Sequence, residues 1–338
     1  MKKGITKILS ACVFAFVVFL AAGTQSKAAV NMGVKQTGAG SSYVDLAWDA
    51  QLGAGHYHTQ FSQDGKNWID MDNSSSPSES VYNLTQGASY YARVVAYKGS
   101  HYTGTHVMIG VSETAIVSTK PTEVSGLTQT AAGVNSVSMS WNASAGAASY
   151  VIYGYINYNW TQIGTSATNS ATITGVAATT STRFSVAAVK NVTGGTVTGD
   201  QCSGVEMKAI PIKVSRIAMQ YYWDSLKEAK YIWTDVNNAD GYQYEVKSAN
   251  GKKTYFRATS TNSYTYVKPF PRGIFVKARV RAYVTVGNKV YYGAWSPYTY
   301  HASSKKVTAK RSSNGKKIYL KWKKVSGASG YQVYVSTK

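Results

Sequence analysis

Cysteine is almost absent from the 338-residue chain, which contains only Cys12 and Cys202. Cys12 lies in an apolar N-terminal segment that is typical of an export signal, so Cys202 is the one cysteine expected in the mature chain. A single cysteine excludes an intramolecular disulfide and a cysteine-based metal site. Cys202 also has no neighbouring histidine that would activate its thiol. The domains must therefore be stabilised by their hydrophobic cores alone.

Motifs of the common catalytic sites are also absent. The sequence has no GxSxG, no HExxH and no phosphate-binding glycine loop. His56 and His58 would face the same side of a strand, but no third ligand for zinc is evident. Asp64, Asp70 and Asp72 lack the spacing of a calcium-binding loop. We therefore expect a protein that is not an enzyme and that holds no metal and no cofactor.

Long hydrophobic runs are confined to the first 28 residues. Three early lysines precede an apolar run from Ile8 to Ala22, and Ser26 and Ala28 place small residues at the positions of a cleavage site. The run is shorter than a typical membrane span and is soon followed by polar residues. We predict a signal peptide over residues 1–28, a secreted chain that is associated with the cell surface, and no integral membrane segment after cleavage.

No long helical periodicity is present, whereas 27 tyrosines and eight tryptophans favour β-strands. Four segments, VDLAW, VSMSW, AKYIW and IYLKW, alternate in polarity and end on a tryptophan. A turn follows each segment, and a tyrosine stands nine residues after the tryptophan. The pairs are Trp48/Tyr57, Trp141/Tyr150, Trp233/Tyr242 and Trp322/Tyr331. The tryptophans lie 93, 92 and 89 residues apart, which predicts repeats of about 90 residues.

The repeat sets the expected domain boundaries. We predict three complete repeats over residues 29–120, 121–211 and 212–302, followed by a partial fourth repeat over residues 303–338. The last segment contains only the first strands of a domain, so we expect the sequence to be a fragment of a longer protein. The linkers are short and two of them contain proline, which predicts that neighbouring domains are restrained.

This pattern resembles bacterial fibronectin type III domains in arrays of secreted or surface proteins of Gram-positive type. That family has a buried tryptophan on the second strand and a Gly-Tyr at the start of the third. In the first repeat, Leu84 is followed six residues later by Tyr90, which is similar to the tyrosine corner of the family. The second repeat departs from this, with Thr182 at the matching position. The resemblance implies an all-β fold of tandem immunoglobulin-like (fibronectin type III-like) β-sandwiches, with Tyr90 and the eight residues of the four pairs in the structural core.

Acidic residues are scarce where basic residues are most frequent. The net charge is +21, but residues 30–205 hold seven basic and nine acidic residues, whereas residues 206–338 hold 25 basic and six acidic residues. Nine basic residues and no acidic residue lie between positions 305 and 324, namely Lys305, Lys306, Lys310, Arg311, Lys316, Lys317, Lys321, Lys323 and Lys324. This charge predicts attraction to polyanions. The alternative is that the lysines guard an edge strand against pairing with another chain.

Two aromatic clusters offer rings for carbohydrate stacking. Trp160 in YGYINYNW and Trp295 in GNKVYYGAWS both lie among tyrosines near predicted hairpins. An indole ring can stack on the face of a sugar, and neighbouring asparagines can bond its hydroxyl groups. The alternative is that these rings form cross-strand pairs on the surface of a sheet. The sequence leaves both interpretations open.

These observations predict a non-catalytic spacer and interaction protein that is secreted and held at the cell surface. The expected partner is an anionic cell-wall polymer or polysaccharide, bound through the basic C-terminal half, or another surface protein. No nucleic acid is expected, because the chain is exported. The alternative is the accessory arm, carbohydrate-binding or spacer, of a wall- or polysaccharide-degrading enzyme whose catalytic domain lies beyond residue 338. The scaffold itself does not identify the ligand.

Overall fold

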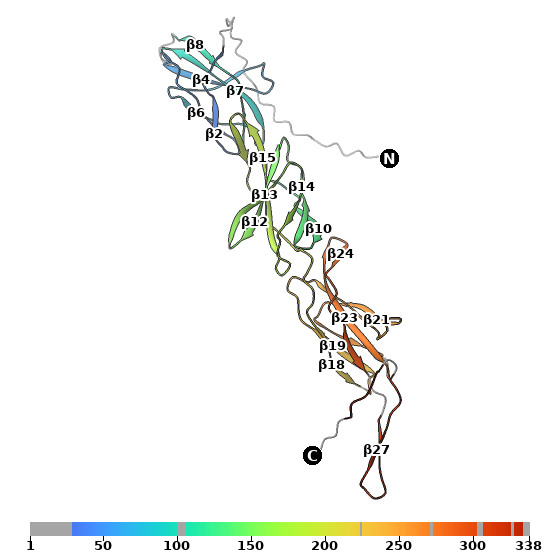
Figure 1. Ribbon diagram of the computed structural model, residues 1–338. Coiled ribbons are helices and arrows are strands. Elements are labelled where there is room, and N and C mark those ends of the chain that lie inside the picture. Colours follow the sequence, from blue (N-terminus) through green and yellow to red (C-terminus); the bar gives the residue numbers. More distant parts are fainter. Residues whose placement is uncertain are drawn as a thin grey trace, which may run out of the picture. The chain divides into compact units, whose positions relative to one another are not determined.

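A computed structural model describes residues 29–99, 106–223, 225–270, 273–302, 307–325 and 328–333. All regular elements in these residues are β-strands (Figure 1), which confirms the predicted all-β fold class. None of the described elements is a helix with the length and apolar character needed to cross a membrane. The predicted signal peptide lies outside the described residues.

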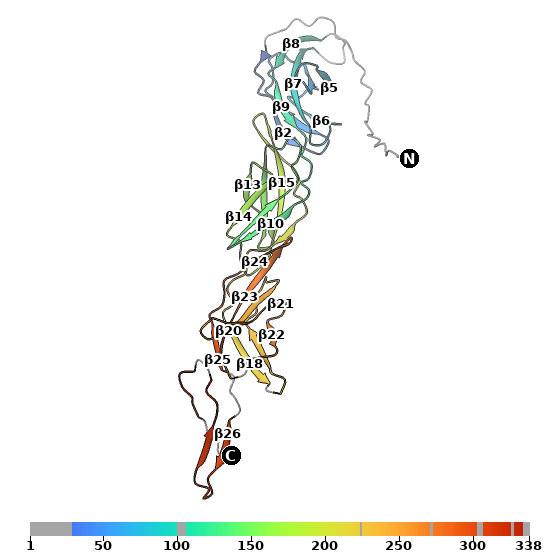
Figure 2. The same cartoon turned by 90° about the vertical axis from the view of Figure 1, so that its right-hand side faces the viewer.

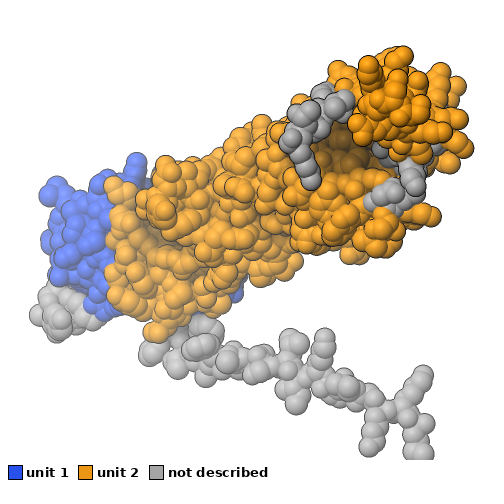
Figure 3. All heavy atoms as spheres, turned by 90° about the horizontal axis from the view of Figure 1, so that it is seen from below, with its two compact units in different colours: residues 1–34, 47–79, 91–115 blue, residues 35–46, 80–90, 116–338 orange. Residues whose placement is uncertain are grey.

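The chain divides into two compact units (Figure 3). The first unit consists of residues 1–34, 47–79 and 91–115, and the second consists of residues 35–46, 80–90 and 116–338. The first unit therefore holds most of one sheet of the first repeat. The second unit contains the second and third repeats, the start of the fourth, all of β2 (Lys35–Ala39), most of β3 (Val44–Ala47) and β9 (Ala115–Ser118), and half of β6 (Ser78–Val81).

The sheet of the first unit has the strand order β1-β8-β7-β4-β5, in which β1 runs parallel to β8 and the other pairs are antiparallel. Its strands are β1 (Ala29–Val30), β4 (His56–Ser62), β5 (Ile69–Ser74), β7 (Ser89–Lys98) and β8 (Val107–Ser112). Tyr57 and Phe61 on β4 are buried and lie opposite Ala96 and Ala92 on β7. The two-residue period of the strands thus buries one face of the sheet.

The second repeat is a β-sandwich. One of its sheets has the order β10-β11-β14, and the other has the order β13-β12-β15-β16 with β17 paired to β15. The strands are β10 (Thr128–Gly133), β11 (Ser136–Ser140), β12 (Ser149–Ile156), β13 (Asn159–Ser166), β14 (Ser170–Thr174), β15 (Thr182–Val192), β16 (Gly195–Thr198) and β17 (Val205–Met207). Met139 from the first sheet and Val186 from the second belong to one buried core.

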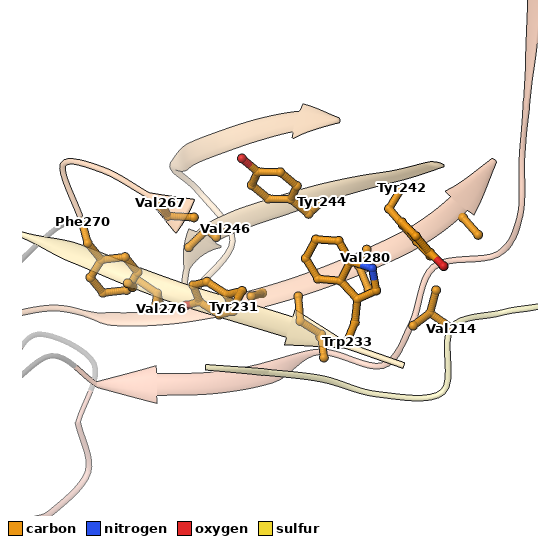
Figure 4. Close-up of a cluster of buried hydrophobic side chains, with 14 of the residues drawn as sticks. Val214, Tyr231, Trp233, Tyr242, Tyr244, Val246, Val267, Phe270, Val276 and Val280 are labelled. Carbon is orange, nitrogen blue, oxygen red and sulfur yellow. The ribbon is translucent and has the colours of Figure 1, made fainter. Parts of the chain in front are cut away.

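The third repeat has the same strand order, with sheets β18-β19-β22 and β21-β20-β23-β24 and with β25 paired to β23. The strands are β18 (Ile217–Trp223), β19 (Glu228–Trp233), β20 (Gly241–Ser248), β21 (Thr254–Ser260), β22 (Tyr264–Val267), β23 (Phe275–Val286), β24 (Lys289–Tyr292) and β25 (Thr299–Ala302). Tyr231 and Trp233 from β19 share a core with Val276 and Val280 from β23 (Figure 4).

Strand β23 shows how the sequence separates the core of the third repeat from its surface. Val276, Ala278, Val280 and Ala282 have no exposed surface, and the basic residues between them are only half-buried on the opposite face. Because successive side chains of a strand point to opposite faces, one strand can be apolar inside and basic outside. The core therefore fixes the position of the basic residues on the outer face.

The described part of the fourth repeat is an antiparallel hairpin of β26 (Thr308–Arg311) and β27 (Ile318–Lys321) (Figure 2). All the strand residues are exposed. Trp322 is only half-buried and Tyr331 is 45% exposed, so the prediction that these two residues belong to a core is wrong. A two-stranded hairpin offers no second sheet that would cover their rings.

Candidate functional site

The Trp–Tyr pair has the same geometry in all four repeats. The two rings meet edge to face, with centroids 5.3 to 5.4 Å apart and interplanar angles of 60 to 67°. The tyrosine hydroxyl accepts a hydrogen bond from the backbone N–H of the third residue after the tryptophan. These donors are Gln51, Ser144, Val236 and Val325, at 3.0, 3.0, 2.7 and 2.6 Å. The nine-residue spacing therefore ties the intervening turn to the ring and has a structural role.

The predicted core residues of the first three repeats are all buried, namely Trp48, Tyr57, Tyr90, Trp141, Tyr150, Trp233 and Tyr242. The hydroxyl of Tyr90 accepts a hydrogen bond from the Thr85 N–H at 3.0 Å, which is the contact that a tyrosine corner makes. Tyr242 also donates to the Asp235 carboxylate. Burial and this hydrogen bond raise the pKa of Tyr242 to about 12. These side chains stabilise the repeats and are not accessible to a ligand.

The outer face of the larger sheet in the third repeat carries a cation–π cluster, which consists of Lys277, Arg279, Arg281, Tyr292, Trp295 and Tyr298. The guanidinium carbon of Arg281 lies 3.9 Å from the ring centroid of Tyr292 and 4.4 Å from that of Trp295. The guanidinium carbon of Arg279 lies 4.3 Å from Trp295 and 4.8 Å from Tyr298, and Lys277 Nζ lies 4.5 Å from Tyr298. The three cations of β23 therefore alternate with three rings from residues 292–298.

Glu245 on β20 is the anionic member of this face, and it is fully buried. Its Oε1 atom accepts a hydrogen bond from Arg279 Nε at 2.6 Å and lies 3.1 Å from Lys247 Nζ, and its Oε2 atom accepts one from Arg257 at 2.6 Å. Burial alone would raise the pKa of Glu245, but the hydrogen bonds from Arg257, Lys247 and Arg279 outweigh burial and lower the pKa to about 2. The carboxylate stays ionised and holds three cations together.

The charges on this face do not balance. Three of its five cations pair with Glu245, whereas Arg281 donates from Nε and from a terminal nitrogen to the Gln243 side-chain oxygen at 2.9 and 2.6 Å. Among the described residues, Glu245 is the only carboxylate that pairs with these cations. The face keeps a net positive charge and can attract an anion.

The basic hairpin, residues 307–325, holds seven of the nine predicted polyanion-binding residues. These are Lys310, Arg311, Lys316, Lys317, Lys321, Lys323 and Lys324, and all seven are exposed. The other two, Lys305 and Lys306, lie outside the described residues. The hairpin sequence has no acidic residue, and no ion pair between described residues involves it. Its cations are therefore exposed without a compensating carboxylate.

The two predicted sugar-stacking residues are already in contact with protein groups. Trp160 on β13 lies opposite Tyr155 on β12, with ring centroids 5.3 Å apart, and its indole sits so close to Gly204 that a Cβ there would be 2.8 Å from the ring. Trp295 has two guanidinium groups over its ring. A sugar would have to displace one of them in order to stack. The contacts of both rings agree with packing on the sheet surface.

The structure brings His56 and His58 close to a third histidine, His106, which the sequence did not single out. The ring centroids of the three lie 5.4 to 6.2 Å apart. His56 Nδ1 is 2.9 Å from the Gly99 carbonyl oxygen, and His58 Nδ1 is 3.9 Å from an Asp70 carboxylate oxygen. No group of three His, Cys, Asp or Glu side chains among the described residues is arranged to hold a metal ion.

Asp64 and Cys202 have structural surroundings. The Asp64 carboxylate accepts hydrogen bonds from the backbone N–H groups of Asn67 and Lys66, both at 2.8 Å, and these bonds lower the pKa of Asp64. This carboxylate therefore closes a surface turn. The Cys202 thiol is buried, and its sulfur accepts a hydrogen bond from the Val186 N–H at 3.3 Å. It belongs to the core of the second repeat.

No protein-family model and no curated protein sequence matches the chain. Among solved structures, the chain is similar to the FN1–FN3 domains of chicken CNTN1, a contactin, with 15% sequence identity and a TM-score of 0.33. The match covers 81% of this chain and 98% of that chain. The second and third repeats have the same strand order, with two sheets over one core, so each of them is an all-β sandwich.

Proposed function

We propose that the chain is a non-catalytic spacer and interaction array that attaches to an anionic polymer of the cell surface through its basic C-terminal half. The basic hairpin carries this proposal, because seven exposed cations lie on 19 residues that contain no acidic side chain. Water and mobile counterions surround such cations, so the binding of a polyanion is favoured when it replaces those counterions. The outer face of the third repeat adds further positive charge beside it in the sequence.

Export determines which polyanions the chain meets. The sequence pattern of residues 1–28 supports secretion, and outside the cell the available polymers are anionic wall polymers and acidic polysaccharides. The first two repeats support a spacer role, since together they hold eight basic and ten acidic residues. These two repeats therefore carry no comparable positive electrostatic field. The same attachment would serve a surface protein or the accessory arm of a wall- or polysaccharide-degrading enzyme.

Binding to isolated walls tests this function. A chain of residues 29–338 is expected to pellet with walls at about 0.1 M NaCl and to be released near 1 M NaCl, because the Debye length falls from about 10 Å to about 3 Å. The triple variant Lys310→Gln, Lys316→Gln, Lys317→Gln should bind at least about tenfold more weakly, since each lysine near an anionic surface contributes about 1 kcal/mol.

The matched control removes the same number of exposed lysines from the first repeat, as Lys35→Gln, Lys66→Gln, Lys98→Gln. This control is expected to bind within about twofold of the parent chain. Equal weakening of the two triple variants, or binding that does not respond to salt, would contradict the proposal.

A further inference from the structure

The smaller sheet of the third repeat, β18-β19-β22, exposes a group of aromatic side chains on its outer face. This aromatic patch consists of Tyr221, Trp223, Tyr264 and Tyr266. Trp223 is 54% exposed, Tyr266 49% and Tyr264 40%. Large rings with this much exposure, gathered on one face, commonly mark an interaction site.

Strand pairing explains why these rings meet. On the central strand β19, Lys230 lies opposite Tyr221 of β18 on one side and opposite Tyr266 of β22 on the other. Tyr231, the next residue, is buried and points into the core (Figure 4), so Lys230 lies on the outer face. The three residues form one row across the sheet. Two rings that are far apart in the sequence are thereby placed on either side of one cation.

Lys230 is surrounded by the rings. Its Nζ atom lies 5.0 Å from the centroid of Tyr264, 5.7 Å from that of Tyr266 and 6.0 Å from that of Tyr221. Tyr221 and Trp223 have centroids 5.0 Å apart, and Tyr264 and Tyr266 have centroids 5.9 Å apart. The patch thus combines apolar ring faces with a single central positive charge.

Trp223 differs in its surroundings from Trp295 and Trp160. Trp295 has the guanidinium groups of Arg279 and Arg281 over its ring, and Trp160 packs on Gly204. Trp223 is more exposed than Trp160, and no cation among the described residues lies over its ring. About half of the Trp223 surface is therefore accessible to a ligand. Among the described residues, the acidic neighbour of the patch is Glu228, which lies opposite Trp223 in the strand register.

We propose that the aromatic patch binds the sugar rings of an acidic polysaccharide. The apolar face of a pyranose stacks on Trp223 and Tyr264, and a carboxylate on the sugar pairs with Lys230, directed away from Glu228. This inference rests on the proposed attachment to an anionic polymer and narrows the polymer to one built from carboxylated sugar rings. A polyol-phosphate chain has no ring that could use the exposed aromatic faces.

Two anionic probes of different chemistry test this inference. Polygalacturonate offers carboxylated pyranose rings, and inorganic polyphosphate offers negative charge without rings. The affinity of the chain of residues 29–338 for each probe is measured by calorimetry over a range of NaCl concentrations. Both should bind at low salt, whereas binding at high salt should persist for polygalacturonate alone, because stacking is not screened by salt.

Substitutions in the patch should separate stacking from charge. Trp223→Ala with Tyr264→Ala is expected to weaken binding to polygalacturonate about tenfold, because both stacking surfaces are lost. Its affinity for polyphosphate should stay within about twofold. The control Tyr155→Ala with Trp160→Ala removes an exposed pair from the second repeat and should change neither affinity. Glu228→Gln should strengthen binding to polygalacturonate.

The outcomes distinguish the inference from the proposed function. Binding to both probes at low salt, with no selective loss of polygalacturonate in the patch variant, would overturn the inference and leave attachment by charge intact. Failure to bind either probe would overturn the proposed function. A measurement on the unmodified chain avoids any effect of the substitutions on folding, because the NMR signal of the Trp223 indole N–H should shift with polygalacturonate and not with polyphosphate.

Discussion

The second and third repeats have the same interior and different exteriors. Both place a Trp–Tyr pair with one geometry between sheets of the same strand order. The second repeat, residues 121–211, holds three basic and three acidic residues, whereas the third, residues 212–302, holds 14 basic and five acidic residues. The inward positions of a strand therefore determine the fold, and the outward positions are available for function.

One cross-strand pair shows this difference at a single position. In the second repeat, Tyr153 on β12 lies opposite Ser185 on β15. In the third repeat, the corresponding pair is Glu245 on β20 opposite Arg279 on β23. Each pair begins three residues after the tyrosine of its repeat. The third repeat thus has a buried ion pair where the second repeat has an uncharged pair, although the strand order of the two repeats is the same.

Loss of the buried tryptophan tests whether the two interiors are equivalent. Trp141→Ala and Trp233→Ala should each destabilise their own repeat by about 3–5 kcal/mol, because each leaves a large cavity. Trp322→Ala should cost less than about 1 kcal/mol, since Trp322 is only half-buried. Residue-resolved hydrogen exchange on the 29–338 chain measures each repeat separately. Unchanged protection in the third repeat of Trp233→Ala would contradict the common core.

The Glu245→Gln substitution should disrupt the ion cluster that distinguishes the outer face of the third repeat from that of the second. It leaves Arg257, Lys247 and Arg279 around a site without a negative charge, and removal of one partner from a buried ion pair costs about 3–5 kcal/mol. The corresponding change in the second repeat, Tyr153→Phe, should alter stability by less than about 0.5 kcal/mol. Denaturant unfolding of the third repeat measures the loss. Equal effects of the two substitutions would show that the ion cluster is not stabilising.

Acid should destabilise the third repeat more than the second. The pKa of Glu245 is about 2 in the folded chain against 4.5 ordinarily, so its contribution is complete above pH 4.5 and is lost as the pH falls towards 2. A shift of this size corresponds to on the order of 3 kcal/mol. Hydrogen exchange at a series of pH values compares the two repeats, after correction for intrinsic exchange rates. The excess acid sensitivity should disappear in Glu245→Gln.

A small gain is expected at the β12–β13 hairpin of the second repeat. Asn157 and Tyr158 have φ angles of 50° and 65°, and Tyr158 is 89% exposed, so its ring contributes little packing. Because glycine adopts positive φ without steric cost, Tyr158→Gly should stabilise the repeat by about 0.5–1 kcal/mol. Tyr158→Ala keeps the Cβ atom and should give no gain. A loss of stability in Tyr158→Gly would show that the tyrosine ring is in contact with the domain.

The alternating strands and the Trp–Tyr spacing were visible in the sequence because both depend on neighbours along the chain. Val276, Ala278, Val280 and Ala282 alternate with basic residues, and this pattern alone predicts which face of β23 is buried. Tyr331 was predicted to lie in a core, but it is exposed. Its burial would require a second sheet, which the described residues of the fourth repeat do not provide.

The surface clusters were missed because they depend on strand register between distant segments. Glu245 meets Arg279, which is 34 residues away, and Lys230 lies opposite Tyr266, which is 36 residues away. His106 joins His56 across the sheet of the first unit in the same way. Alternation gives the face on which a residue lies, but only the register gives its neighbours on that face.

Hydrogen exchange with and without an anionic wall polymer tests the central claim most directly. The account predicts that the polymer protects residues 307–325 and the third repeat in the 29–338 chain at about 0.1 M NaCl, and that the protection is lost near 1 M NaCl. The first and second repeats should exchange as they do without the polymer. Protection centred on residues 121–211, or none in the basic hairpin, would contradict attachment through the basic C-terminal half.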